Sequence, residues 1–134
     1  MEKALRELAG PSRPLRELML DKGLAALGDA LVNFAYSLAI SLDEGRPVGR
    51  RLDNRLLAEA LRASGLRAEA PKRMDRHQLA DAAEALLAYG WLTGLVGFWE
   101  IVEALRGPSP LEGLSGLLRR IAEKAPGANV SAQM

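Results

Sequence analysis

The sequence contains no cysteine and only one histidine, His77, among its 134 residues. A chain without cysteine forms neither a disulfide framework nor a thiolate metal site, and a single histidine excludes a zinc site built from several histidines. Carboxylates are therefore the plentiful metal ligands that remain. Oxygen ligands of this kind suit Mg²⁺ or Mn²⁺.

The chain also has no strong excess of positive or negative charge, and its composition shows no sign of disorder. The net charge is +1, so no overall electric field commits the chain to a nucleic acid or to a membrane surface. Apolar residues make up 49% of the chain and charged residues 26%, as in ordinary globular proteins. The length fits one domain with a single core.

The start of the chain, "MEKALRELAG", lacks the apolar stretch of a signal peptide. The most hydrophobic stretch, residues 24–42, has the length of a membrane span, but it contains Asp29 and Asn33. An acid at mid-span costs about 3 kcal/mol on insertion, which favours a buried helix in a soluble protein. We therefore expect a cytoplasmic protein with no membrane partner.

Strand patterns are absent as well, because nearly every segment has helical periodicity. The expected fold class is all-α. We predict an N-terminal extension over residues 1–14, a single helical domain over 15–125 and a flexible tail over 126–134. Helices are predicted over residues 2–8, from 15 onward, and over 22–42, 55–65, 76–94, 96–105 and 110–125, with loops over 43–49 and 66–73. The expected N-caps are Asp53 or Asn54 for one helix and Asp75 for another.

The long helix predicted over residues 22–42 is apolar around most of its circumference. At about 100° per residue, one face holds Leu24, Leu27, Gly28, Leu31, Ala35 and Leu38, and a narrow polar stripe holds Lys22, Asp29, Asn33 and Ser37. Such a helix is covered on several sides, by other helices or by a second subunit. A glycine inside a helix costs about 1 kcal/mol relative to alanine, and close approach of another backbone would explain Gly28. The aromatic residues Phe34, Trp91, Phe98 and Trp99 are expected to be core or subunit contacts.

Two acids, Asp81 and Glu84, stand one turn apart in the alanine-rich helix segment "LADAAEAL" at residues 79–86. Side chains at i and i+3 lie side by side on a helix, so these two carboxylates could share one metal ion. The alternative is an exposed polar stripe, because acids near a helix start are favoured by the helix dipole.

The middle of the chain is basic: residues 46–76 carry nine basic and four acidic side chains. Arginine is a good phosphate ligand because its planar guanidinium can bond two oxygens at once. The alternative is a solvated surface with ion pairs. The candidate phosphate ligands are Arg50, Arg51, Arg55, Arg73 and Arg76.

Two segments about fifty residues apart, "LGDALVN" (27–33) and "LADAAEAL" (79–86), resemble the two metal-binding segments of the ribonuclease III catalytic domain. The stretch "LDNRLLAEALRASGLR" (52–67) looks like the family's intervening helix with its glycine turn. The segment "AYGWLTG" (88–94) resembles the residues that close the second metal helix. The resemblance covers about residues 15–106, and the chain looks most like small archaeal relatives that consist of little more than this domain.

The resemblance implies an all-helical endonuclease domain that works as a homodimer on double-stranded or structured RNA. By motif position, Asp29, Asp81 and Glu84 carry over as the catalytic metal ligands for Mg²⁺ or Mn²⁺. His77 stands one turn before Asp81 and could pair with it or act in proton transfer. Because no double-stranded-RNA-binding domain is expected after residue 105, the candidate arginines would have to hold the RNA, through its shape and phosphates.

The sequence departs from the family pattern at two positions on the first metal helix. The family places a glutamate one turn before the glycine–aspartate pair, where this chain has Ala25, and another acid three residues earlier, where it has Lys22. Three hypotheses therefore stand: a metal-dependent ribonuclease, a catalytically inactive dimeric RNA-binding or ribonucleoprotein component of the same fold, and an unrelated helical bundle.

Overall fold

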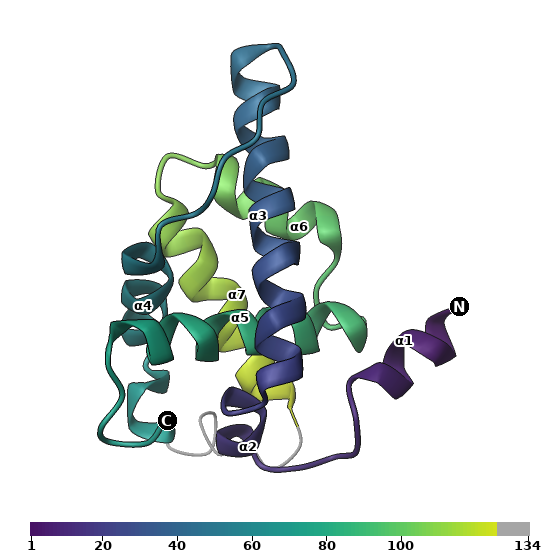
Figure 1. Cartoon of the computed structure of the whole chain (residues 1–134), viewed down its shortest axis with the longest axis vertical. Coiled ribbons are helices and arrows are strands. Elements are labelled where there is room, and N and C mark those ends of the chain that lie inside the picture. The colour runs from purple at the N-terminus through teal and green to yellow at the C-terminus, as the bar shows by residue number, and fades with distance from the viewer. Residues whose placement is uncertain (126–134) are drawn as a thin grey trace.

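The computed structural model describes residues 1–125, which form an all-α bundle without strands, as the periodicity predicts (Figure 1). The predicted tail over residues 126–134 lies outside the described residues. The elements are α1 (Glu2–Leu8), α2 (Leu15–Met19), α3 (Lys22–Glu44), α4 (Asn54–Ala63), the 3₁₀ helix η1 (Leu66–Glu69), α5 (Arg76–Leu92), α6 (Phe98–Arg106) and α7 (Pro110–Lys124).

Local capping chemistry sets where the helices begin. The Asp53 carboxylate accepts a hydrogen bond from the Arg55 N–H at 2.8 Å, so Asp53 and not Asn54 is the N-cap of α4. Asp75 caps α5 as predicted, in a reciprocal capping box with Gln78. Both helices start where an acidic side chain satisfies a free backbone N–H.

Several helix boundaries differ from the predicted ones. Helix α3 continues to Glu44, beyond the predicted end at residue 42, because the first residue able to adopt a left-handed cap is Gly45, with φ +73°. Residues 66–69 form η1 and not a loop. Helix α6 begins at Phe98, later than predicted, because the Glu100 carboxylate accepts from the Gly97 N–H and caps the helix there.

Helices α3 and α5 form the central contact of the bundle. Helix α3 follows the long axis of the molecule, and α5 crosses it near the lower half of Figure 1. The crossing is close at Gly28, where an added Cβ would lie 2.0 Å from the backbone carbonyl oxygen of Glu84. The expected close backbone approach at Gly28 is confirmed, and it positions Glu84 directly against α3.

The apolar surface of α3 is divided between the core and solvent. Leu24, Val32, Ala35 and Ala39 are buried with Gly28, whereas Leu27, on the same predicted apolar face as Leu24, is 40% exposed in the single chain. The other helices of the chain cover the side of α3 that contains Val32. Leu27 lies outside this covered side.

Large apolar side chains therefore remain exposed on α3 and α6. Phe34 is 62% exposed and Trp99 is 64% exposed. Phe98 joins them, with ring centroids 5.5 Å from Phe34 and 5.4 Å from Trp99. By length and composition α3 could cross a membrane, yet 28% of its most apolar window is already buried inside the chain. We call Leu27, Phe34, Leu42, Phe98 and Trp99 the open apolar face.

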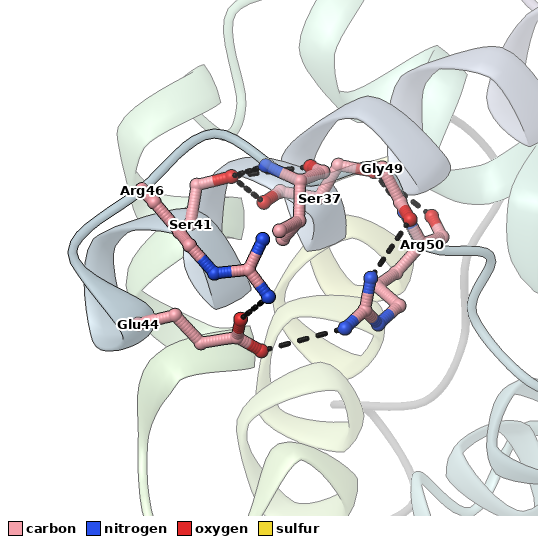
Figure 2. A network of polar contacts seen from close by, with 7 residues as sticks. Ser37, Ser41, Glu44, Arg46, Gly49 and Arg50 are labelled. Atoms are coloured by element: carbon pink, nitrogen blue, oxygen red, sulfur yellow. Dashed lines mark hydrogen bonds and ion pairs between the residues drawn. The ribbon is translucent and has the colours of Figure 1, made fainter.

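Residues 46–53 run back along α3 toward α4 as an extended segment, which we call the strap (Figure 1). Three polar side chains of α3 bind its backbone. The Val48 N–H donates to Ser41 Oγ at 2.9 Å, the Arg50 N–H to Ser37 Oγ at 2.8 Å, and the Leu52 N–H to Asn33 Oδ1 at 2.7 Å. Figure 2 shows the serine part of this network.

The contacts repeat because the spacing of the polar side chains along α3 matches the spacing of alternate residues along the strap. Four residues of a helix advance about 6 Å, and two residues of an extended chain advance about 6.6 Å. Every second strap residue therefore meets every fourth residue of α3. At the far end, Glu44 pairs with Arg46 and Arg50 at 3.0 and 3.5 Å (Figure 2). The polar stripe on α3 holds the strap in one register and fixes where Arg51 lies.

Candidate functional site

A pocket of about 470 Å³ opens beside the crossing of α3 and α5. It brings together the three predicted metal ligands, Asp29 from α3 and Asp81 and Glu84 from α5. The rest of its lining is Lys22, Ala25 and Ala26 of α3, Arg51 of the strap and Asn54 at the start of α4. Carboxylates that are some fifty residues apart in the sequence thus share one cavity, and their role as ligands stays a prediction.

Glu84 is a buried acid in this pocket, with 4% of its surface exposed. Its Oε2 atom is buried and has no hydrogen-bond partner. Burial raises the pKa of Glu84 to about 8, with further upward contributions from the neighbouring carboxylates of Asp29 and Asp81. Glu84 is therefore protonated at neutral pH, and its free oxygen lacks a partner.

Asp81 has the opposite environment to Glu84, although the two acids are one turn apart. Its side chain is exposed. The side chains of residues three apart on a helix point in directions that differ by about 60°. This difference is enough for Glu84 to lie against α3 while Asp81 faces solvent. Asp81 is thus exposed and Glu84 buried, although both line the pocket, and whether they share a metal ion stays a prediction.

Asp29 is half-exposed at the mouth of the pocket, and one of its carboxylate oxygens accepts two hydrogen bonds. Its Oδ1 accepts from Asn33 Nδ2 at 2.9 Å and from Arg51 Nη2 at 3.3 Å. Asn33 also binds the strap at Leu52, so one amide connects the strap to Asp29. The sequence signal for this role was the position of Asn33, one turn after Asp29 in the same polar stripe.

His77 contacts Asn54 and not Asp81. Its Nδ1 lies 3.3 Å from Asn54 Nδ2, because the start of α4 lies beside the start of α5. The predicted pairing of His77 with Asp81 is therefore not present in the structure. His77 instead supports Asn54, a residue that lines the pocket.

The predicted phosphate-binding arginines fall into two groups. Arg50 and Arg51 pair with Glu44 and Asp29, at 3.5 and 3.3 Å. The other three have exposed side chains and form no ion pair within the part of the chain that the structure describes: Arg55, Arg73 and Arg76. Arg55 and Arg76 stand at the starts of α4 and α5, where the helix dipole adds positive potential.

The oxygen atoms that line the pocket suit a hard divalent cation, but they do not surround a single point closely enough to enclose one. Carboxylates and an amide oxygen are ligands that Mg²⁺ prefers, and the Glu84 Oε2 atom has no hydrogen-bond partner and is free to bind a metal ion. Within residues 1–125, no three His, Asp or Glu side chains are arranged closely enough to enclose an ion by themselves. Ala25 adds no donor, so water would have to complete the coordination of a bound ion.

The raised pKa of Glu84 predicts a stability that falls as pH rises. Between pH 4.5 and about 8 the folded chain keeps a proton on Glu84 that the unfolded chain has released. In EDTA, the free energy of unfolding should therefore fall by up to about 1.4 kcal/mol per pH unit across this range. Urea denaturation followed by tryptophan fluorescence measures it. The Glu84→Gln variant should lack this component, and an identical pH slope in both proteins would contradict the assignment.

The sequence model of a family described as Ribonuclease III matches residues 22–115, which is more than half of the chain. The matched region contains every residue that lines the pocket, together with the strap and the Gly28 crossing. No curated protein sequence gives a significant match to the chain.

Proposed function

The chain belongs to the ribonuclease III family, and from that premise we propose that it is a Mg²⁺-dependent endoribonuclease acting on double-stranded or structured RNA. Asp29, Asp81 and Glu84 are the proposed metal ligands, with Mn²⁺ as an alternative ion. The observation that supports this best is their convergence on one pocket, in which the buried Glu84 Oε2 has no partner.

Phosphodiester hydrolysis needs positive charge at the reacting phosphate. A divalent ion held by Asp29, Asp81 and Glu84 would lower the pKa of the attacking water and offset the negative charge that collects in the transition state. The attacking water gives up a proton as its oxygen forms a bond to phosphorus, one P–O ester bond breaks, and the leaving alkoxide takes up a proton, so no net proton is gained or lost. Glu84 must give up its own proton before it can bind a metal, so metal binding should release a proton to solvent.

The exposed arginines support an RNA-binding surface around the pocket. Arg55, Arg73 and Arg76 have exposed side chains near the starts of α4 and α5. Charges of this kind hold phosphates without reading sequence, as expected for recognition of double-stranded RNA by shape. Arg50 and Arg51 could join them only by exchanging a carboxylate partner for a phosphate.

A homodimer is the second part of the proposal, because the open apolar face needs a cover. Large apolar side chains exposed together are typical of a protein–protein interface. The face also borders an apolar cavity of about 500 Å³, lined in part by Phe34, Leu38, Leu42 and Val48. In a symmetric dimer each subunit would offer the same surface to the other and contribute its own carboxylate pocket.

An inactive RNA-binding component of the same fold is the second candidate. Three residues of the pocket favour it: Ala25 lacks a ligand, Lys22 has the wrong charge for one, and Arg51 pairs with Asp29 at 3.3 Å. Such a protein would bind RNA as a dimer but would not cut it.

Cleavage of end-labelled double-stranded RNA in Mg²⁺ or Mn²⁺ separates the two candidates. We expect cutting that stops in EDTA and falls at least tenfold in Asp81→Asn, because a lost ligand should cost at least as much as a lost supporting contact. Glu103→Gln removes a charge from an acid that is 72% exposed on α6, and should cut normally. Metal-independent cutting or an unaffected Asp81→Asn would refute the proposal. RNA binding without cutting would favour the inactive component.

A further inference from the structure

The carboxylate pocket contains two cations of the protein itself. Lys22 and Arg51 line it together with Asp29, Asp81 and Glu84, and its other lining residues are uncharged. Arg51 contacts Asp29 at 3.3 Å and forms no other ion pair within residues 1–125. Lys22 has an exposed side chain and forms no ion pair within the same residues.

The backbone positions of both cations are fixed by their surroundings. Lys22 is the first residue of α3, directly after the N-cap Asp21, whose carboxylate accepts from the Leu24 N–H at 2.8 Å. Arg51 lies on the strap between Arg50 and Leu52, and the backbone of both neighbours is bonded to α3. One side chain therefore reaches the pocket from the first turn of α3, and the other reaches it from the strap.

An independent observation indicates that the pocket is built for a ligand. Glu84 is 4% exposed and its Oε2 atom has no partner among the described residues. A buried carboxyl oxygen without a hydrogen bond is costly. A bound cation would supply the missing contact.

Counting charges indicates how many ions such a pocket can hold. With metal bound, the three carboxylates carry three negative charges, and Lys22 and Arg51 carry two positive ones. One divalent ion then leaves a single positive charge, which one phosphodiester neutralises. A second divalent ion would leave the pocket and its phosphate with two uncompensated positive charges, at separations where Coulomb repulsion is strong.

We propose that Lys22 and Arg51 take the place of a second divalent cation, so that the pocket binds one divalent ion and holds one RNA phosphate between that ion and the two side chains. This inference rests on the proposed function, because it concerns the same pocket. The inference explains both departures from the family pattern. Lys22 places a positive charge where the family has an acid, and Ala25 removes a carboxylate that a second metal ion would need.

The number of bound ions tests this directly. Mn²⁺ binding to the full chain, counted by electron paramagnetic resonance of the free ion, should give one ion per chain. The double variant Lys22→Glu/Ala25→Glu should bind two, since it replaces one positive charge by a negative one and adds a second carboxylate. Glutamate in the first turn of α3 also favours the helix, so the variant is expected to fold. Lys3→Glu makes the same charge change on the exposed α1 and should keep one ion.

RNA binding in Ca²⁺ gives a second readout that does not depend on cleavage. If Lys22 and Arg51 hold a phosphate, Lys22→Ala and Arg51→Ala should each lower the slope of log K against log salt by about one. Lys3→Ala should leave the slope unchanged.

The outcomes separate this inference from the proposed function. Two Mn²⁺ ions in the wild-type protein, one ion in the double variant, or unchanged salt slopes in both alanine variants would overturn the inference and leave a metal-dependent ribonuclease standing. No Mn²⁺ binding to the wild-type protein would overturn both.

Discussion

Replacing Gly28 by alanine should lower the free energy of unfolding by about 3 kcal/mol or more. The new Cβ would lie 2.0 Å from the carbonyl oxygen of Glu84 and 2.5 Å from its carbonyl carbon. Both are backbone atoms, so no side chain can rotate away, and α3 and α5 would have to separate. Alanine gains about 1 kcal/mol of helix propensity over glycine, and the clash exceeds this gain.

Urea denaturation of Gly28→Ala and wild type measures the loss, and Gly116→Ala is the matched control. Gly116 also lies inside a helix, α7, but nothing lies within 4 Å of its added Cβ. The control should be as stable as the wild type or up to about 1 kcal/mol more stable. If Gly28→Ala were as stable as the control, the helix crossing would not be as close as described.

The second large effect is expected for Phe34→Asp, which should weaken the proposed homodimer by at least about 30-fold in Kd, or 2 kcal/mol. Phe34 is 62% exposed in the single chain and stacks on Phe98 at 5.5 Å. An aromatic side chain at the centre of an interface contributes strongly, and a carboxylate in its place would be buried without a partner.

Sedimentation equilibrium over a dilution series measures this dissociation constant. The change should do little to the fold of one chain, because Phe34 is already exposed there. Leu8→Asp is the matched control, since Leu8 is 67% exposed but lies on α1, away from the open apolar face. A monomeric wild type, or an unchanged Kd in Phe34→Asp, would show that this face is not the dimer interface.

Features controlled by neighbouring residues could be predicted from the sequence. Helical periodicity gave the all-α class, and Asp75 marked the start of α5 because a capping side chain and the N–H that it binds lie within one turn. The resemblance to the family identified the carboxylates that the structure gathers in one pocket. Gly28 was recognised as a close contact because a glycine in a helix interior is costly.

Features that depend on distant segments could not be predicted in this way. Leu24 and Leu27 lie in the same turn, yet one is buried and the other exposed, because the position of the neighbouring helices decides how much of the apolar surface is covered. The pairing of His77 with Asn54, and not with Asp81, depends on how α4 lies beside α5.

The existence of the helices and the Asp75 cap followed from the sequence, because each depends on side chains within one or two turns. The three acids followed only from the resemblance to the family. The burial of Glu84 beside an exposed Asp81, and the contact of Arg51 with Asp29 across 22 positions of the chain, follow from the packing of the helices and the strap. The physical reason is that burial and charge pairing depend on which surfaces meet. Here that is set by the backbone contact at Gly28 and by the hydrogen bonds that hold the strap on α3.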